Sequence, residues 1–296
     1  MNSSYRVKSV IAALCLCALC ACGKGKENGG AQPETVAGEE NRTQPQAAAA
    51  AAGSTMAPEE EETFGPWEWD VNGDGTAETV EIALLEGEWE RYGVRVTAGE
   101  RSDTWDTAVS YRPRLRIEDL DGDGVSEILF WGDAGSDDYE LTVLRWDQGF
   151  TAVPFAGKDG DDRVDLMYGA LEAVEGNAIT VGSWQYVLGT YGGRRRFELG
   201  EDGVFRPAAG SIWEFAGNET YLTTTRELSG AMDDGTSAIP AGARLRLLGW
   251  DGVSQVYFET GDGVRGTLAV SRGEEYGWQI GGVREEECFA FLPYAG

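Results

Sequence analysis

Residues 119–130 of the chain read Asp119-Leu120-Asp121-Gly122-Asp123-Gly124-Val125-Ser126-Glu127-Ile128-Leu129-Phe130. Oxygen-bearing side chains occupy loop positions 1, 3 and 5, a glycine occupies position 6, and a carboxylate occupies position 9. Every second side chain of such a loop points inward and the glycine permits a sharp turn, so the oxygens can surround a hard cation such as calcium. The apolar run that follows directly predicts a strand leading away from the loop.

The same pattern occurs 49 residues upstream, as Asp70-Val71-Asn72-Gly73-Asp74-Gly75-Thr76-Ala77-Glu78. The first copy also satisfies the EF-hand loop, because Glu81 lies at position 12. An EF-hand needs flanking helices, whereas Gly65-Pro66 precedes this loop and a strand pattern follows it. In the second copy Phe130 lies at position 12, where it cannot bind a metal. We therefore expect calcium-binding loops between strands, with a metal-free hairpin turn rich in Asp, Asn and Gly as the alternative.

Period-2 alternation of apolar and polar residues dominates from Trp67 onward, and Gly-Asp-Gly, Asp-Gly and Gly-Gly turns interrupt it. Only residues 166–174 are a weak candidate for an amphipathic helix. The sequence therefore predicts an all-β fold. Strands are expected at residues 80–84, 94–96, 115–117, 128–131, 141–144, 243–250, 255–260 and 264–270, with hairpin turns at Asp251-Gly252 and Asp262-Gly263.

Around the acidic loops the chain resembles FG-GAP/VCBS-type repeats, which also occur in integrin propellers. The resemblance covers residues 70–84 in the first copy and 115–131 in the second. Two copies are too few to close a propeller of four or more blades, so a partial propeller-blade-like or sandwich β domain is expected over residues 64–210. The resemblance implies two sets of metal ligands: Asp70, Asn72, Asp74, the carbonyl of Thr76 and Glu78, and Asp119, Asp121, Asp123, the carbonyl of Val125 and Glu127.

Residues 211–296 contain a second recognisable order of turns and strands. Pro240-Ala241-Gly242 precedes a strand, Asp-Gly, the strand around residues 255–260, Gly-Asp-Gly and a final strand. This order resembles bacterial Src-homology-3-like domains of cell-envelope proteins, which implies a small β-barrel-like domain. Thr267 stands where that family usually has a tryptophan, and a generic antiparallel sandwich edge is the alternative.

The N-terminus has the pattern of a targeting segment. Arg6 and Lys8 precede an apolar run, and residues 1–21 are expected to be a lipoprotein signal peptide. Leu19-Cys20-Ala21-Cys22-Gly23 resembles the bacterial lipoprotein cleavage box, although Cys20 departs from the usual residue. The resemblance implies a lipid on Cys22, anchored to the extracellular face of the bacterial cytoplasmic membrane; ordinary secretion is the alternative. The rest of residues 22–63 has the composition of a disordered tether.

Charge and composition exclude several functions. The formal net charge is −27, which repels nucleic acid and anionic lipid headgroups and attracts cations. The chain has no histidine, so catalytic triads that use histidine, histidine-ligated zinc and histidine-ligated haem are all excluded. We therefore expect a protein that is not an enzyme.

The leading hypothesis is a membrane-anchored extracellular lipoprotein, a binding or scaffold module of the cell envelope stabilised by calcium. Its partner would be a cell-envelope polymer, a carbohydrate or a protein. Ten tryptophans, with Trp67 and Trp69 on one face of a strand, support a carbohydrate-binding module as an alternative, although core filling also explains that pair. A carboxylate-pair glycoside hydrolase is a third class, because that chemistry needs no histidine.

Overall fold

The computed structural model describes residues 55–56, 64–87, 89–136, 138–156, 163–164, 166–273 and 277–295. Residues 51–296 form one compact unit. The predicted signal peptide (1–21), Cys22 and the predicted tether, apart from Thr55–Met56, lie outside the described residues. No helix within the described ranges is long and apolar enough to cross a membrane.

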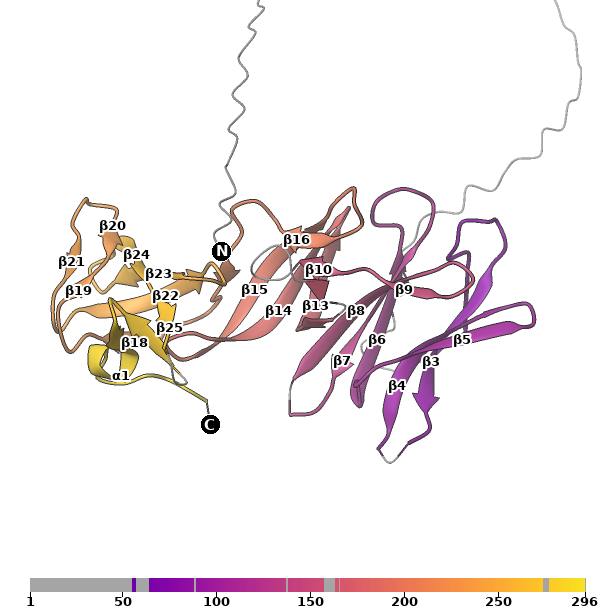
Figure 1. The fold of residues 1–296 in the computed structure, drawn as a ribbon, viewed down its shortest axis with the longest axis horizontal. Helices are drawn as coiled ribbons and strands as arrows, with labels where there is room; N and C mark the ends of the chain where they lie inside the picture. The colour runs from indigo at the N-terminus through magenta and orange to yellow at the C-terminus, as the bar shows by residue number, and fades with distance from the viewer. Residues whose placement is uncertain are drawn as a thin grey trace, which may run out of the picture. The chain divides into compact units, whose positions relative to one another are not determined.

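The described residues are almost entirely β-structure, which confirms the predicted all-β class (Figure 1). The strands form open sheets, and no closed barrel occurs among the residues described. A four-stranded sheet contains β2 (Trp67–Trp69), β3 (Glu78–Leu85), β4 (Arg91–Ala98) and β5 (Arg101–Asp106). A six-stranded sheet contains β1 (Thr55–Met56), β6 (Tyr111–Glu118), β7 (Glu127–Asp133), β8 (Tyr139–Trp146), β9 (Phe150–Ala152) and β12 (Met167–Tyr168).

The remaining strands form one large sheet and two small ones. The large sheet contains β10 (Phe155–Ala156), β11 (Arg163–Val164), β13 (Ala170–Glu175), β14 (Ala178–Tyr186), β15 (Thr190–Leu199), β16 (Phe205–Pro207), β17 (Trp213–Glu214), β18 (Tyr221–Thr223), β20 (Ala231–Met232), β22 (Arg244–Trp250), β23 (Gln255–Thr260) and β24 (Arg265–Ala269). The small sheets contain β19 (Leu228–Ser229) with β21 (Ala238–Ile239), and β25 (Ser271–Arg272), β26 (Trp278–Ile280) and β27 (Val283–Arg284), which α1 (Glu285–Cys288) follows.

The two sequence copies fold into matching antiparallel meanders. The first is β2-β3-β4-β5, and the second is β6-β7-β8 with β9 paired to β8. In each copy the acidic loop joins the first two strands, and the residue before the loop pairs with the glutamate at position 9. These pairs are Trp69 with Glu78 and Glu118 with Glu127. The repeat in the sequence is therefore also a repeat in strand register.

The two meanders share a hydrophobic core. Val80, Ile82, Val94 and Val96 from the first meander pack with side chains of the second, among them Phe130 and the fully buried Trp146. Side chains at alternate positions of one strand point to the same face, which explains why the buried residues alternate along β3 and β4. Fully burying an aliphatic side chain of this size contributes about 1.5–3 kcal/mol.

Strand β7 is buried on both faces, and all seven of its residues are buried. Ile128 and Phe130 point into the core shared by the meanders, whereas Leu129 and Trp131 belong to a second core. That second core also contains side chains of the large sheet, such as Val181 on β14. The strand after the second acidic loop therefore connects the loop rigidly to both cores.

The C-terminal meander was predicted closely, since β22, β23 and β24 form antiparallel pairs in sequence order. The weak helix prediction for residues 166–174 is wrong. These residues form β12 and most of β13, because β12 pairs with β8 and β13 with β14; pairing with neighbouring strands outweighs a weak helical pattern. Hydrogen bonding continues across residue 210, since β17 pairs with both β15 and β22. The division into domains at residues 64–210 and 211–296 stays a prediction.

Candidate metal centre

The first acidic loop is closed by hydrogen bonds from its own backbone. The Asp70 carboxylate accepts hydrogen bonds from the N–H groups of Asp74 and Gly75, at 3.1 and 2.8 Å. The Asn72 side-chain oxygen accepts a bond from Asp74 N–H at 2.9 Å, and the Asp74 carboxylate accepts one from Thr76 N–H at 2.8 Å. The side chains at positions 1, 3 and 5 are therefore held in place by the chain's own N–H groups.

The second loop repeats most of these contacts. The Asp119 carboxylate accepts hydrogen bonds from the N–H groups at loop positions 4 and 6, at 2.8 and 3.0 Å. Asp121 accepts one from Asp123 N–H at 3.2 Å, and Asp123 accepts one from Val125 N–H at 2.8 Å. The glycine at position 6 has a φ of +87° in the first loop and +89° in the second. A glycine adopts this left-handed conformation without steric cost, which confirms its predicted role in the turn.

The glutamate at position 9 lies at the buried base of each loop. Glu78 is 2% exposed and Glu127 is fully buried. Glu78 accepts a hydrogen bond from Val71 N–H at 3.0 Å, and Glu127 accepts the equivalent bond from Leu120 N–H at 2.8 Å. Burial raises the pKa of both carboxyl groups above their usual value. Each glutamate is the first residue of its strand, β3 or β7, and closes its loop by accepting this hydrogen bond from position 2.

The loops differ in what balances the charge of this glutamate. In the second loop Arg145 on β8 lies opposite Glu127, and its Nε donates to the Glu127 carboxylate at 2.6 Å. The same guanidinium donates to Asp121 at 3.1 Å and to Asp123 at 2.8 Å. In the first loop, extending the β3–β4 register by one residue places Ala98 opposite Glu78. The first loop therefore has no counterpart to Arg145 at this position.

In the first loop a neutral amide makes the corresponding bridge. Asn72 Nδ2 donates to Asp74 at 3.2 Å and to Glu78 at 3.3 Å. An amide hydrogen bond adds no positive charge, so the carboxylates of this loop keep their mutual repulsion. The Asp74 and Asp70 charges add to the effect of burial in raising the pKa of Glu78.

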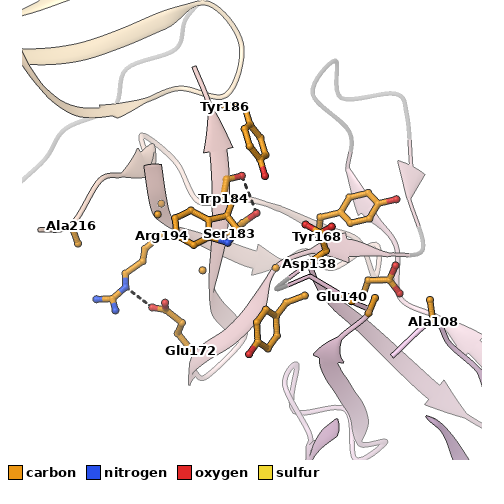
Figure 2. Close-up of a pocket in the computed structure, with 17 residues that line it drawn as sticks. Ala108, Asp138, Glu140, Tyr168, Glu172, Ser183, Trp184, Tyr186, Arg194 and Ala216 are labelled. Atoms are coloured by element: carbon orange, nitrogen blue, oxygen red, sulfur yellow. Dashed lines mark hydrogen bonds and ion pairs between the residues drawn. The ribbon is translucent and has the colours of Figure 1, made fainter. Parts of the chain in front are cut away.

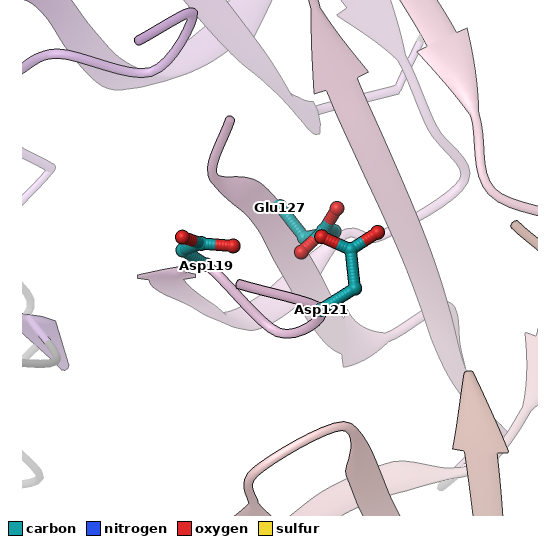
Figure 3. A group of neighbouring side chains, drawn as sticks. All are labelled: Asp119, Asp121 and Glu127. Carbon is teal, nitrogen blue, oxygen red and sulfur yellow. The ribbon is translucent and has the colours of Figure 1, made fainter. Parts of the chain in front are cut away.

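Three of the predicted ligands of the second loop converge. Oxygen atoms of Asp119, Asp121 and Glu127 all lie within 4.8 Å of one another (Figure 3). Calcium binds oxygen at about 2.3–2.6 Å, so oxygens separated by this distance can contact one ion. Among the residues described, this is the only group of three or more aspartate, glutamate, cysteine or histidine side chains that meets at that spacing. The structure does not bring Asp70, Asp74 and Glu78 equally close, and it places Asp123 against Arg145.

The roles predicted for the other ligands are not resolved by these contacts. Thr76 and Val125 donate their N–H groups to the carboxylates at position 5, whereas the resemblance assigned their carbonyl oxygens to the metal. Those carbonyl contacts, and calcium itself, stay predictions.

The two loops lie against each other. Ser126 N–H, at position 8 of the second loop, donates to the carbonyl of Val71 in the first at 3.0 Å. Trp69 Nε1 donates to the Ser126 hydroxyl at 3.1 Å. A Cβ atom added to Gly73 would lie 2.3 Å from the carbonyl oxygen of Gly124, so only glycine allows this approach. Seven carboxylates from the two loops therefore gather in one region, with Arg145 contacting three of them.

Two features of the functional surface were missed from the sequence. Arg145 belongs to a strand 18 residues beyond Glu127, and only strand pairing reveals that they meet. The second is an aromatic pair, Trp184 and Tyr186, which has the same spacing of two residues as Trp67 and Trp69 but is half exposed. By contrast, Trp67 and Trp69 pack against the core shared by the meanders, in line with the expectation that they fill it.

Comparisons with protein-family models, with curated proteins and with solved structures find no match to this chain. The resemblances to FG-GAP/VCBS-type repeats and to Src-homology-3-like domains therefore stay predictions based on the quoted motifs.

Proposed function

We propose that this chain is a non-enzymatic binding protein of the bacterial cell envelope whose β scaffold is stabilised by calcium. The proposal includes a lipid on Cys22 that holds the protein at the extracellular face of the cytoplasmic membrane. The convergence of Asp119, Asp121 and Glu127 in a loop with calcium-binding spacing is the observation that carries it. The cleavage-box resemblance at residues 19–23 supports the location.

The electrostatics of the second loop favour a divalent cation. The loop contributes four carboxylates, and a single guanidinium, that of Arg145, pairs with three of them, Asp121, Asp123 and Glu127. Calcium would take the place of Arg145 as their counter-charge, and the guanidinium would turn toward solvent, since its side chain is already 31% exposed. The competition between guanidinium and metal predicts a weak site, with a Kd of about 10⁻⁴–10⁻³ M as in other extracellular modules.

A stabilising role for the metal follows from the position of the loops. Both loops precede strands that enter the shared core, and β7 also enters the second core. Bound calcium would relieve carboxylate repulsion at the start of these strands. Calcium at ten times its Kd adds about 1.4 kcal/mol to the free energy of unfolding for each site. For a body of this size that raises the melting temperature by about 3–6 °C.

Thermal unfolding of the full chain in a non-ionic detergent tests the proposal, with tryptophan fluorescence as the readout. We expect a higher melting temperature in 10 mM calcium than in chelator, and we expect magnesium to reproduce little of the shift. Asp121→Asn should reduce the calcium shift, whereas Glu201→Gln, in an exposed turn between β15 and β16, should leave it unchanged. Superimposable melting curves in calcium and in chelator would refute the calcium scaffold.

A further inference from the structure

A cleft of about 820 Å³ lies beside the β14–β15 hairpin, away from the acidic loops (Figure 2). It is lined by the end of β14, the start of β15, β12 and the turn and first residues of β8. Its volume lies within the range of about 300–1,000 Å³ that is typical of small-ligand sites. None of the predicted metal ligands lines it, so the cleft is a site separate from the candidate metal centre.

Three large aromatic side chains line the cleft yet remain exposed to solvent. Trp184 is 50% exposed, Tyr186 is 51% exposed and Tyr168 is 69% exposed. Trp184 and Tyr186 are two residues apart on β14, so their side chains leave the same face of the strand. Grouped exposed aromatics are unusual on a soluble surface and mark binding sites. Their ring faces are suited to stacking on a flat ligand that is apolar on its faces and polar at its rim.

Glycines next to these aromatic side chains leave space in the cleft, because they carry no side chain. Gly169, Gly182, Gly192 and Gly193 line the cleft, and a Cβ atom at Gly169 or Gly193 would lie only 2.6 or 2.8 Å from atoms of the neighbouring strand β14. At Gly192, a Cβ atom would instead lie 3.7 Å from the indole of Trp184. A larger side chain there would occupy the space against the ring, which makes this position a probe of the cleft.

The polar groups of the cleft are mostly carboxylates. Asp138, Glu140 and Glu172 line it together with a single cation, Arg194, which pairs with Glu172 at 2.6 Å (Figure 2). Burial raises the pKa of Glu140, which lies half-buried at the start of β8. Carboxylates accept hydrogen bonds from hydroxyl groups and repel anions. The lining therefore favours an uncharged ligand with many hydroxyl groups over an acidic one.

We propose that this cleft binds a neutral glycan chain, with Trp184 and Tyr186 stacking on the faces of its pyranose rings. The hydroxyl groups of the sugar would donate to Asp138 and Glu140, and Arg194 would donate to a ring or hydroxyl oxygen. This inference rests on the proposed function, because it names the ligand class of the non-enzymatic binding protein. It does not depend on calcium.

Affinity electrophoresis of the full chain tests the proposal, in a polyoxyethylene detergent because sugar-based detergents would compete. The probes are soluble neutral polysaccharides, namely laminarin, arabinoxylan, galactomannan and hydroxyethyl cellulose, together with the anionic polysaccharides alginate and pectate. We expect retardation by at least one neutral polysaccharide and by neither anionic one. Retardation by no neutral polysaccharide, or stronger retardation by an anionic one, would overturn the proposal.

Variants locate the binding. Trp184→Ala should weaken retardation at least tenfold, and Gly192→Val should do the same while keeping every aromatic ring. Trp89→Ala is the matched control, because this indole is 75% exposed between β3 and β4 and does not line the cleft. Melting temperatures of all three variants show whether each is folded. Equal binding by the folded Trp184→Ala variant and the parent chain would also overturn the proposal.

Running the gels in calcium and in chelator separates this proposal from the calcium scaffold. Glycan binding without a calcium shift in the melting temperature would reject only the metal site. A calcium shift without glycan binding would reject only the cleft. Shortened oligosaccharides recovered after incubation would contradict a purely binding role, whereas unchanged oligosaccharides would support it.

Discussion

Replacing Arg145 by methionine tests the charge balance of the second loop most directly. The substitution keeps an unbranched stem and removes the guanidinium, which contacts Glu127, Asp121 and Asp123 at 2.6, 3.1 and 2.8 Å. Glu127 is fully buried and would lose its charged partner. We expect the variant to unfold more easily in chelator and to respond more strongly to calcium than the parent chain.

The magnitude follows from the burial of the partners. Removing one member of a fully buried ion pair costs about 3–5 kcal/mol. The Arg145 side chain is 31% exposed and Asp123 is 45% exposed, so solvent screens part of the interaction. Glu127 can also take up a proton, which limits the cost of burying its charge. We therefore expect a loss of about 2–3 kcal/mol in the free energy of unfolding without calcium.

Urea unfolding in chelator and in a calcium series is the assay. Arg95→Met is the matched control, because Arg95 also pairs across strands with a glutamate, Glu81, at 2.8 Å, but both side chains are at least one-third exposed. An exposed pair of this kind contributes about 0.2–1 kcal/mol. Equal losses for Arg145→Met and Arg95→Met in chelator would refute the reasoning, as would a smaller calcium response in Arg145→Met.

Three further substitutions probe the turn, the core and the anchor. Asp251→Ala should cost about 1–2 kcal/mol at neutral pH, because the carboxylate accepts hydrogen bonds from the N–H groups of residues 253–255. Burial opposes the shift, but these bonds hold the pKa of Asp251 below its ordinary 3.8. The carboxylate should therefore contribute to the free energy of unfolding above pH 3.8, and this contribution should be lost as the pH falls through the lower pKa of the folded state. Urea unfolding at several pH values measures this dependence. Leu129→Ala should cost about 2–5 kcal/mol on β7, whereas Leu84→Ala, 58% exposed, should change thermal or urea unfolding little. Cys22→Ser should abolish incorporation of radiolabelled fatty acid and release the protein from membranes, and persistent labelling would contradict lipidation at this residue.

Several parts of the fold were predictable because their signals are local. The strands around residues 80–84 and 128–131 follow from period-2 alternation and a continuous apolar run, and the Asp251-Gly252 turn follows from turn chemistry. The acidic loops also form through contacts between residues that are close together in the sequence. Their glycines, short carboxylates and backbone N–H groups close each loop within nine residues. Sequence spacing therefore predicted where each acidic loop lies and that a strand follows it.

The weak helix candidate at residues 166–174 is wrong for the opposite reason, since the formation of β12 and β13 depends on pairing with other strands, β8 and β14. The loops differ locally at position 3, which is Asn72 in the first and Asp121 in the second. What balances the charge of each loop depends on distant residues, because Arg145 and Ala98 occupy matching places in the two meanders. The exposed pair Trp184 and Tyr186 likewise had the same pattern as the packed pair Trp67 and Trp69.

The sequence by itself determined the all-β class, the two acidic loops and the turns between strands, because backbone conformation and short-range hydrogen bonding depend on neighbouring residues. Only the tertiary structure decided that the loops touch, that Arg145 balances the charge of one of them, and that exposed aromatics meet carboxylates in a cleft. Those features depend on strand pairing and sheet packing, which bring together side chains that are distant along the chain. Electrostatic interaction and solvent exposure are set by that proximity in space.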